Sequence, residues 1–66
     1  MQIVLNGAAH TLADDASLND LMATLSLGNQ AVAVAVNRQV VRRQAWETCV
    51  LRAGDTVDVV RAIGGG

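Results

Sequence analysis

The sequence predicts an α+β domain with a mixed four- to five-stranded sheet and one helix across one face. Residues 2–5, 31–36 and 56–60 alternate in the manner of half-buried strands. Asn6-Gly7 follows the first of these runs and is a strong hairpin signal. Residues 17–28 have the period of an amphipathic helix. A short helix of this kind needs a sheet to cover its apolar stripe, so the two signals together indicate the fold class.

The first hairpin has a predicted register. A two-residue turn at Asn6-Gly7 would pair Ile3 with His10 and place His10 on the core side. We therefore expect either that His10 lies at the sheet margin or that the loop is longer than two residues. Because His10 has no other ligand-type residue at useful spacing, we interpret it as structural rather than as a metal ligand.

The helix has a start signal and a stop signal. Ser17 is the expected N-cap, with Asp20 reaching back to it from the third helical position. Gly28 is the expected stop after the helix. The apolar stripe at i, i+3, i+4 and i+7 consists of Leu18, Leu21, Met22 and Leu25.

The second half of the chain supplies the remaining strands. In residues 31–36 the valines are expected to face the helix and the alanines the other side. Asn37-Arg38 is a predicted turn before a short strand at 39–41. Residues 42–47 are expected to be irregular or one helical turn, with Trp46 against the core edge. The last strand should direct Val57 and Val59 inward and Thr56, Asp58 and Val60 outward.

Composition excludes several classes of function. The net charge of −1 argues against a nucleic-acid partner, and the arginines at 38, 42 and 43 are interpreted as a solvated face. No apolar run is long enough to span a membrane, and the first residues lack the pattern of a signal peptide. Cys49 is the single cysteine, which rules out an intrachain disulfide and suits a reducing compartment. The sequence therefore predicts a small cytoplasmic domain without a metal site.

The chain ends in Gly64-Gly65-Gly66. Terminal glycines are commonly frayed ends or linkers. They can also form a thin arm that carries an uncrowded α-carboxylate into a channel too narrow for side chains. We expect a domain over residues 1–60 and a flexible tail over 61–66. The sequence offers no nucleophile–base pair and no phosphate loop, so we expect no catalysis by the chain itself.

Several segments, in this order, resemble the ThiS family of sulfur carrier proteins over essentially the whole chain. They are Met1 to Gly7, Ser17 to Met22, Ala33 to Asn37, Val40 to Arg43 with Trp46, Gly54-Asp55 and Ala62 to Gly66. One departure is Arg42, where family members often carry Pro. The resemblance implies a ubiquitin-like β-grasp fold, with the first and last strands paired in parallel at the sheet centre.

The resemblance also implies a function for the tail, that of a sulfur carrier in thiamine biosynthesis. Gly66 maps onto the working terminal glycine, and Gly64 and Gly65 belong to the tail motif. A ThiF-like adenylating enzyme would use ATP and Mg²⁺ to activate the Gly66 carboxylate, while the chain itself binds no cofactor. A sulfur donor, such as a cysteine desulfurase persulfide, would convert it to a thiocarboxylate. A ThiG-like thiazole synthase would then take the sulfur for thiazole formation.

Handing over the tail requires docking. We expect a flat, nearly apolar face on the sheet, continuous with the start of the tail, to seat both enzymes in turn. Its residues are Val4, Ala33, Ala35, Val60, Arg61, Ala62 and Ile63. Cys49 lies in an apolar stretch without a basic neighbour, so we expect a buried, inert thiol rather than the sulfur site.

Three alternatives remain open at this stage. The small subunit of molybdopterin synthase shares the fold and the tail, but is usually longer. A ubiquitin-like modifier would form isopeptide bonds with lysines of other proteins. A plain interaction module would have an inert tail. The absence of lysine from the chain means that no side-chain amine of its own could capture an activated terminus.

Overall fold

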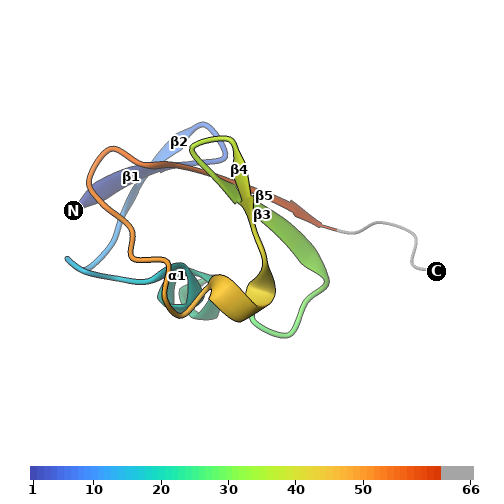
Figure 1. Ribbon diagram of the computed structural model, residues 1–66. Coiled ribbons are helices and arrows are strands. Elements are labelled where there is room, and N and C mark those ends of the chain that lie inside the picture. The colour runs from blue at the N-terminus through green and yellow to red at the C-terminus, as the bar shows by residue number, and fades with distance from the viewer. Residues whose placement is uncertain (62–66) are drawn as a thin grey trace.

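The computed structural model describes residues 1–61. Five strands form one sheet, with α-helix α1 (Leu18–Thr24) and 3₁₀ helix η1 (Arg43–Ala45) on one side of it (Figure 1). The strands are β1 (Gln2–Leu5), β2 (Ala8–Thr11), β3 (Val32–Val36), β4 (Gln39–Val41) and β5 (Thr56–Arg61). This arrangement confirms the predicted α+β class and the predicted mixed sheet.

The last strand of the described chain is the central one. The strand order is β2-β1-β5-β3-β4. Strand β5 runs parallel to β1, with Val4 opposite Thr56, and antiparallel to β3. The parallel pairing of first and last strands that the resemblance implied is therefore present. The start of β5 is therefore paired with a neighbouring strand on both sides.

Both tight hairpins turn through residues with positive φ. Asn6 and Gly7 have φ values of 49° and 84°, and Ile3 pairs with His10 as the two-residue turn predicted. Asn37-Arg38 repeats the pattern, with φ values of 50° and 69°. Type I′ turns need positive φ at both central residues because this twist matches that of the flanking strands.

Helix α1 starts where the sequence predicted. The Ser17 hydroxyl oxygen accepts a hydrogen bond from the backbone N–H of Asp20 at 3.1 Å. The Asp20 carboxylate accepts one from the backbone N–H of Ser17 at 2.9 Å. This reciprocal capping box satisfies two N–H groups that the first turn would otherwise leave without partners.

The end of α1 differs from the prediction. We expected Gly28 to stop the helix, but Ser26 takes the left-handed conformation, with a φ of 60°. The backbone N–H of Leu27 donates to the Met22 carbonyl at 2.8 Å, and that of Ser26 donates to the Ala23 carbonyl at 3.0 Å. This is a Schellman motif, and both Leu27 and Met22 are buried in the core. The apolar contact fixes the stop at the serine, against its weaker preference for positive φ.

The core lies between the inner face of the sheet and the two helical segments. Trp46, expected at the core edge, is 1% exposed and among the largest fully buried side chains. Its ring N–H donates to the Val41 carbonyl at 3.1 Å. The buried apolar residues are Ile3, Leu12, Ala16, Leu18, Leu21, Met22, Leu27, Val34, Trp46, Leu51 and Val57.

Candidate functional site

The predicted working group lies outside the described residues. This group is the carboxylate of Gly66, and the tail-motif residues Gly64 and Gly65 and the predicted docking residues Ala62 and Ile63 lie outside the described residues as well. What the structure describes is the strand that leads to them. Strand β5 pairs with β3 along its length, from Val57 opposite Val36 to Arg61 opposite Val32. The base of the tail is therefore a central strand rather than a loop.

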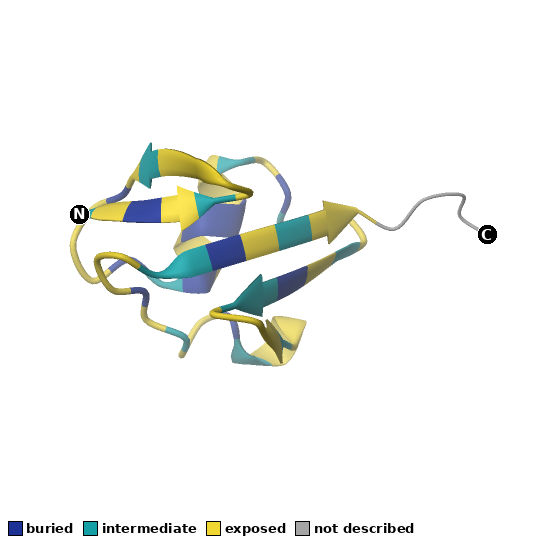
Figure 2. Ribbon diagram, turned by 90° about the horizontal axis from the view of Figure 1, so that it is seen from above, coloured by how far each residue is buried: buried dark blue, intermediate teal, exposed yellow. Residues whose placement is uncertain are grey.

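Four of the predicted docking residues lie on the outer face of the sheet, away from α1. Ala33 pairs with Val60 and Ala35 with Asp58, so their side chains share a face. Val4 pairs with Thr56, two residues before Asp58, and therefore lies on the same face. Figure 2, which views the sheet from this side, shows exposed residues alternating with buried and intermediate ones along the strands.

Sequence reasoning missed one residue of this face. Val40 pairs with Ala35 and is 76% exposed, more than Val60 at 63% or Val4 at 36%. The alternation of residues 39–41 was a usable signal, because Val41 is partly buried against the core. We use the name outer patch for the apolar group formed by Ala33, Ala35, Val40 and Val60.

The outer patch has a charged neighbour and a boundary. Asp58 is exposed and lies in β5 between Thr56 and Val60, directly beside Ala35. Because Val4 lies across β5 beside Thr56, these two polar residues separate it from the outer patch. The predicted face is therefore an apolar patch at the β3–β4–β5 side of the sheet, with Val4 apart from it.

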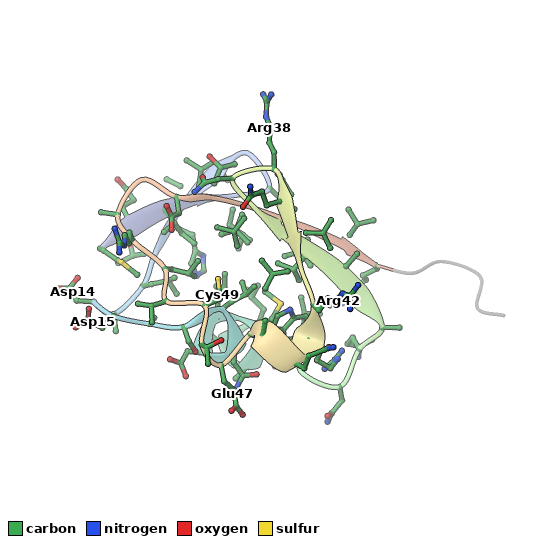
Figure 3. All side chains as sticks on the ribbon, viewed as in Figure 1. Asp14, Asp15, Arg38, Arg42, Glu47 and Cys49 are labelled. Atoms are coloured by element: carbon green, nitrogen blue, oxygen red, sulfur yellow. The ribbon has the colours of Figure 1, made fainter. Side chains whose placement is uncertain are left out.

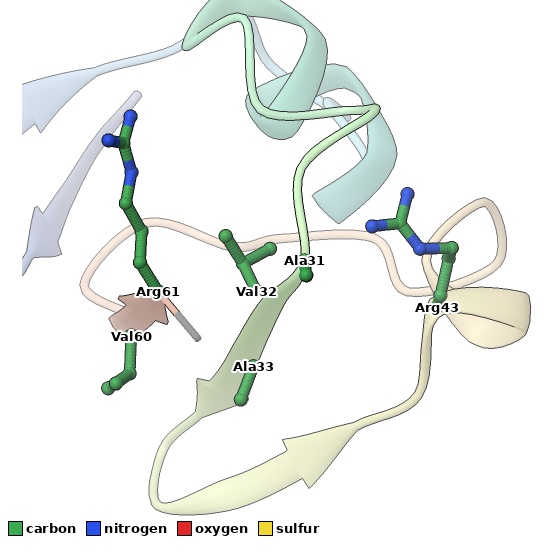
Figure 4. Close-up of a pocket in the computed structure, with 6 residues that line it drawn as sticks. All are labelled: Ala31, Val32, Ala33, Arg43, Val60 and Arg61. Atoms are coloured by element: carbon green, nitrogen blue, oxygen red, sulfur yellow. The ribbon is translucent and has the colours of Figure 1, made fainter. Parts of the chain in front are cut away.

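Arg61 lies on the opposite face from the residues with which it was grouped. It follows Val60 in the strand, and successive side chains of a strand point to opposite faces. Figure 4 shows Arg61 on the same side as Val32, while Val60 and Ala33 point the other way. These four residues, with Ala31 and Arg43, line a hollow of about 370 Å³ at this end of the sheet.

The arginine cluster is only partly a solvated face. Arg38 points away from the sheet at the tip of the β3–β4 turn (Figure 3). Arg43 instead donates to the backbone carbonyls of Gly28 and Gln30. Its guanidinium carbon lies 4.6 Å from the centroid of the Trp46 ring, a cation–π arrangement. This side chain therefore fastens η1 to the segment that precedes β3, a structural role that the charge pattern did not predict.

The thiol of Cys49 has the environment of an unreactive group. Cys49 is partly buried, and Figure 3 shows it beside α1, where its backbone carbonyl accepts from Leu18 N at 2.8 Å. Burial, and then the nearby Asp55 carboxylate, raise the pKa of the thiol above its usual value. Both effects disfavour the thiolate, which is the nucleophilic form. Cys49 is thus partly buried rather than buried as predicted, and the expectation that it is not the sulfur site stays a prediction.

Residues 1–61 contain neither a metal-binding cluster nor a membrane-spanning helix. They contain no group of three His, Cys, Asp or Glu residues placed to hold a metal ion. Their one α-helix is too short and too polar to be a membrane span.

Comparison with known proteins decides the family. The model of the ThiS family matches residues 3–66, which include the glycines at the end of the chain. The chain belongs to the ThiS family.

Individual relatives agree with this family assignment. The sulfur carrier protein ThiS of Escherichia coli K12 is 30% identical over 66 residues, which are the whole of both chains. A thiazole synthase of Magnetococcus marinus is 38% identical over 66 residues, so this chain spans 20% of the length of that protein. A crystal structure of the thiamine biosynthesis protein ThiS from Geobacter metallireducens has a TM-score of 0.86, at 28% identity and full coverage of both chains. A solution structure of a thiamine biosynthesis protein from that organism has a TM-score of 0.81, and the match covers all of this chain and 88% of the other.

These matches confirm the predicted ThiS family and its ubiquitin-like β-grasp fold. They place the chain among the sulfur carrier proteins of thiamine biosynthesis, which carry a group and are not themselves catalysts.

Proposed function

We propose that the α-carboxyl group of Gly66 is the group that carries sulfur, and that β5 and the sheet present it to two enzymes in turn. The observation that carries this proposal is the end-to-end match to the ThiS carrier of Escherichia coli. The family match runs to Gly66, so the three terminal glycines lie within the matched residues.

The first step would be adenylation of Gly66 by a partner enzyme. A terminal carboxylate has an unperturbed pKa of about 3.3–3.7, so it is anionic at neutral pH and a poor electrophile. One of its oxygens would attack the α-phosphorus of ATP, and the bond to pyrophosphate would break. The product is an acyl-adenylate in which AMP is a good leaving group. A ThiF-like enzyme would supply the ATP site, the Mg²⁺ and the cationic groups that stabilise phosphoryl transfer.

The second step would replace AMP by sulfur at the Gly66 carbonyl carbon. Sulfide displaces AMP directly and leaves a thiocarboxylate. A persulfide, such as that of a cysteine desulfurase, first forms an acyl disulfide, and a thiol must then reduce the sulfur–sulfur bond to release the thiocarboxylate. Glycine suits both displacements because its α-carbon carries no side chain to crowd the attacked carbonyl.

The third step would be transfer of this sulfur to a ThiG-like thiazole synthase. The match to the thiazole synthase of Magnetococcus marinus supports this partner, because a stretch similar to the whole carrier belongs to that protein. The outer patch is the proposed docking surface for both enzymes. It is apolar, its two valines are largely exposed, and it includes Val60 of the strand that leads to the tail, all of which suits repeated association with partners.

The test is the intact mass of the protein after incubation with ATP, Mg²⁺, the ThiF-like enzyme and a sulfur donor. We expect an increase equal to the difference between one sulfur and one oxygen atom. Deleting Gly66 should abolish the increase. The matched control is Cys49→Ala, which should be converted like the wild type because the thiol takes no part. Conversion of the deletion variant, or loss of conversion in Cys49→Ala, would overturn the proposal.

A further inference from the structure

Strand β5 continues beyond the end of its parallel neighbour. The pairing of β1 with β5 ends at Leu5 opposite Val57, whereas β5 runs on to Arg61. On its other side β5 remains paired with β3 up to Arg61. Figure 2 shows β5 extending past β1 toward the end of the chain. The second half of β5 is therefore an interior strand on one side and an edge strand on the other.

The hydrogen-bond pattern shows which backbone groups face the open side. The N–H of Asn6 donates to the Val57 carbonyl at 2.9 Å, so Val57 points its backbone groups toward β1. The N–H of Asn37 donates to the Thr56 carbonyl at 2.7 Å, so Thr56 faces the β3 side. Backbone groups alternate along a strand. Val59 and Arg61 therefore direct their N–H and C=O groups toward the open side.

Asn6 satisfies the first of these groups with its side chain. Its Oδ1 accepts a hydrogen bond from the N–H of Val59 at 2.8 Å, across 53 residues of sequence. Since Asn6 is already in the turn, its side-chain amide takes the place of the next carbonyl of β1. Past this point, within residues 1–61, the Val59 carbonyl and the Arg61 N–H meet no neighbouring strand.

The other two edge strands, β4 and β2, differ from the open edge of β5 in the availability of their backbone groups or in their position in the sheet. Strand β4 is three residues long, and the Trp46 ring N–H already occupies the carbonyl of Val41. Strand β2 is at the far edge, separated from β5 by β1. Natural proteins usually blunt an exposed edge with proline, lysine or a bulge. The open edge of β5 has no proline, lysine or bulge, carries the one charged side chain of Arg61, and leads directly to the tail.

We propose that this open edge, Val59 to Arg61, binds an extended segment of the adenylating enzyme by β-strand addition, so that the sheet continues into the partner. The inference rests on the proposed function. Five residues separate Arg61 from the Gly66 carboxylate, a reach of roughly 17 Å when fully extended, so the enzyme must approach this edge closely. Three of the five are glycines, which can be recognised only through their backbone. Backbone pairing that starts at Val59 sets the register of that segment.

The test compares two substitutions at Arg61. Arg61→Pro removes the N–H from the open edge, while Arg61→Ala removes only the side chain. Proline is tolerated where the missing N–H faces away from the neighbouring strand, so the pairing with β3 should survive. Loss of one backbone hydrogen bond should weaken binding of Arg61→Pro to the adenylating enzyme about fivefold relative to Arg61→Ala. Equal dissociation constants for the two variants would overturn the inference.

A second measurement uses the unaltered chain, in case proline disturbs the fold. We expect the Arg61 amide to exchange its hydrogen rapidly in the free protein and slowly in the complex. The Val59 and Val60 amides, held by Asn6 and by β3, should be protected in both states. An Arg61 amide that exchanges equally fast in the complex would refute strand addition. Normal thiocarboxylate formation by the same sample would show that the proposed function stands without it.

Discussion

Both faces of the sheet carry valines, but the valines of the inner face are buried and those of the outer face are exposed. Val34 and Val57 on the inner face are 1% and 0% exposed, whereas Val40 and Val60 on the outer face are 76% and 63% exposed. The inner valines belong to the core cluster that also contains the buried residues of α1 and Trp46. Within the described part of the chain, no element covers the outer ones (Figure 1). Exposed valines of this kind, beside the strand that leads to the last residues of the chain, are the feature on which the proposed docking surface rests.

The largest expected effect comes from placing the same charge on each face. Val34→Asp would bury a carboxylate without a partner, at a cost on the order of 3–5 kcal/mol. The whole stability of a chain of this length is about 3–10 kcal/mol, so we expect this variant to be largely unfolded. Val60→Asp puts the carboxylate in water and should change the free energy of unfolding by less than about 0.5 kcal/mol.

Urea unfolding followed by circular dichroism measures both variants. A cooperative Val34→Asp variant of near wild-type stability would mean that the inner face is not the core. An unfolded Val60→Asp variant would mean that the outer face is covered after all. Either result breaks the contrast between the faces on which the docking proposal depends.

A smaller effect is expected from a substitution on the outer face that leaves the fold intact. Ala33→Arg places a long charged side chain in the outer patch and should weaken binding to the adenylating enzyme and to the thiazole synthase about tenfold, or about 1.4 kcal/mol. Ala9→Arg is the matched control, because Ala9 is also exposed on this face but lies in β2, beyond β1. Isothermal titration of each variant with each enzyme gives the dissociation constants. Equal affinity of Ala33→Arg and the wild type would refute the docking role of the outer patch.

Local patterns in the sequence were sufficient for most of the fold. Alternation assigned the faces of β3 and β5, and the hairpin dipeptide and the capping box fixed the start of the chain and of α1. The end of α1 was not predictable in the same way. The contact of Leu27 with the core outweighs the local preference for glycine, and that contact exists only in the folded protein.

The site was less accessible to sequence reasoning than the fold. The role of Arg43 depends on carbonyls of Gly28 and Gln30, which lie 15 and 13 residues away and are brought to it by tertiary structure. The face of Arg61, by contrast, followed from simple alternation after Val60. It was missed because the residue was counted with the tail instead of with the strand. Val40 was missed because its short strand was not assigned a face.

The smallest expected effect concerns Cys49, whose exposure lies between those of the two faces. Burial and Asp55 raise the pKa of its thiol in the folded protein, while in the unfolded chain the value is about 8.5. The folded state therefore holds the proton more tightly. The stability linked to this proton is fully present below about pH 8.5 and is lost as the pH rises through the folded-state pKa.

Urea unfolding of the wild type and of Cys49→Ala from pH 7 to pH 10 isolates the contribution of the thiol, because the other titrations are common to both proteins. We expect the wild type to lose stability relative to Cys49→Ala above pH 8.5, and parallel curves would mean that the thiol is as solvated as an outer-face residue.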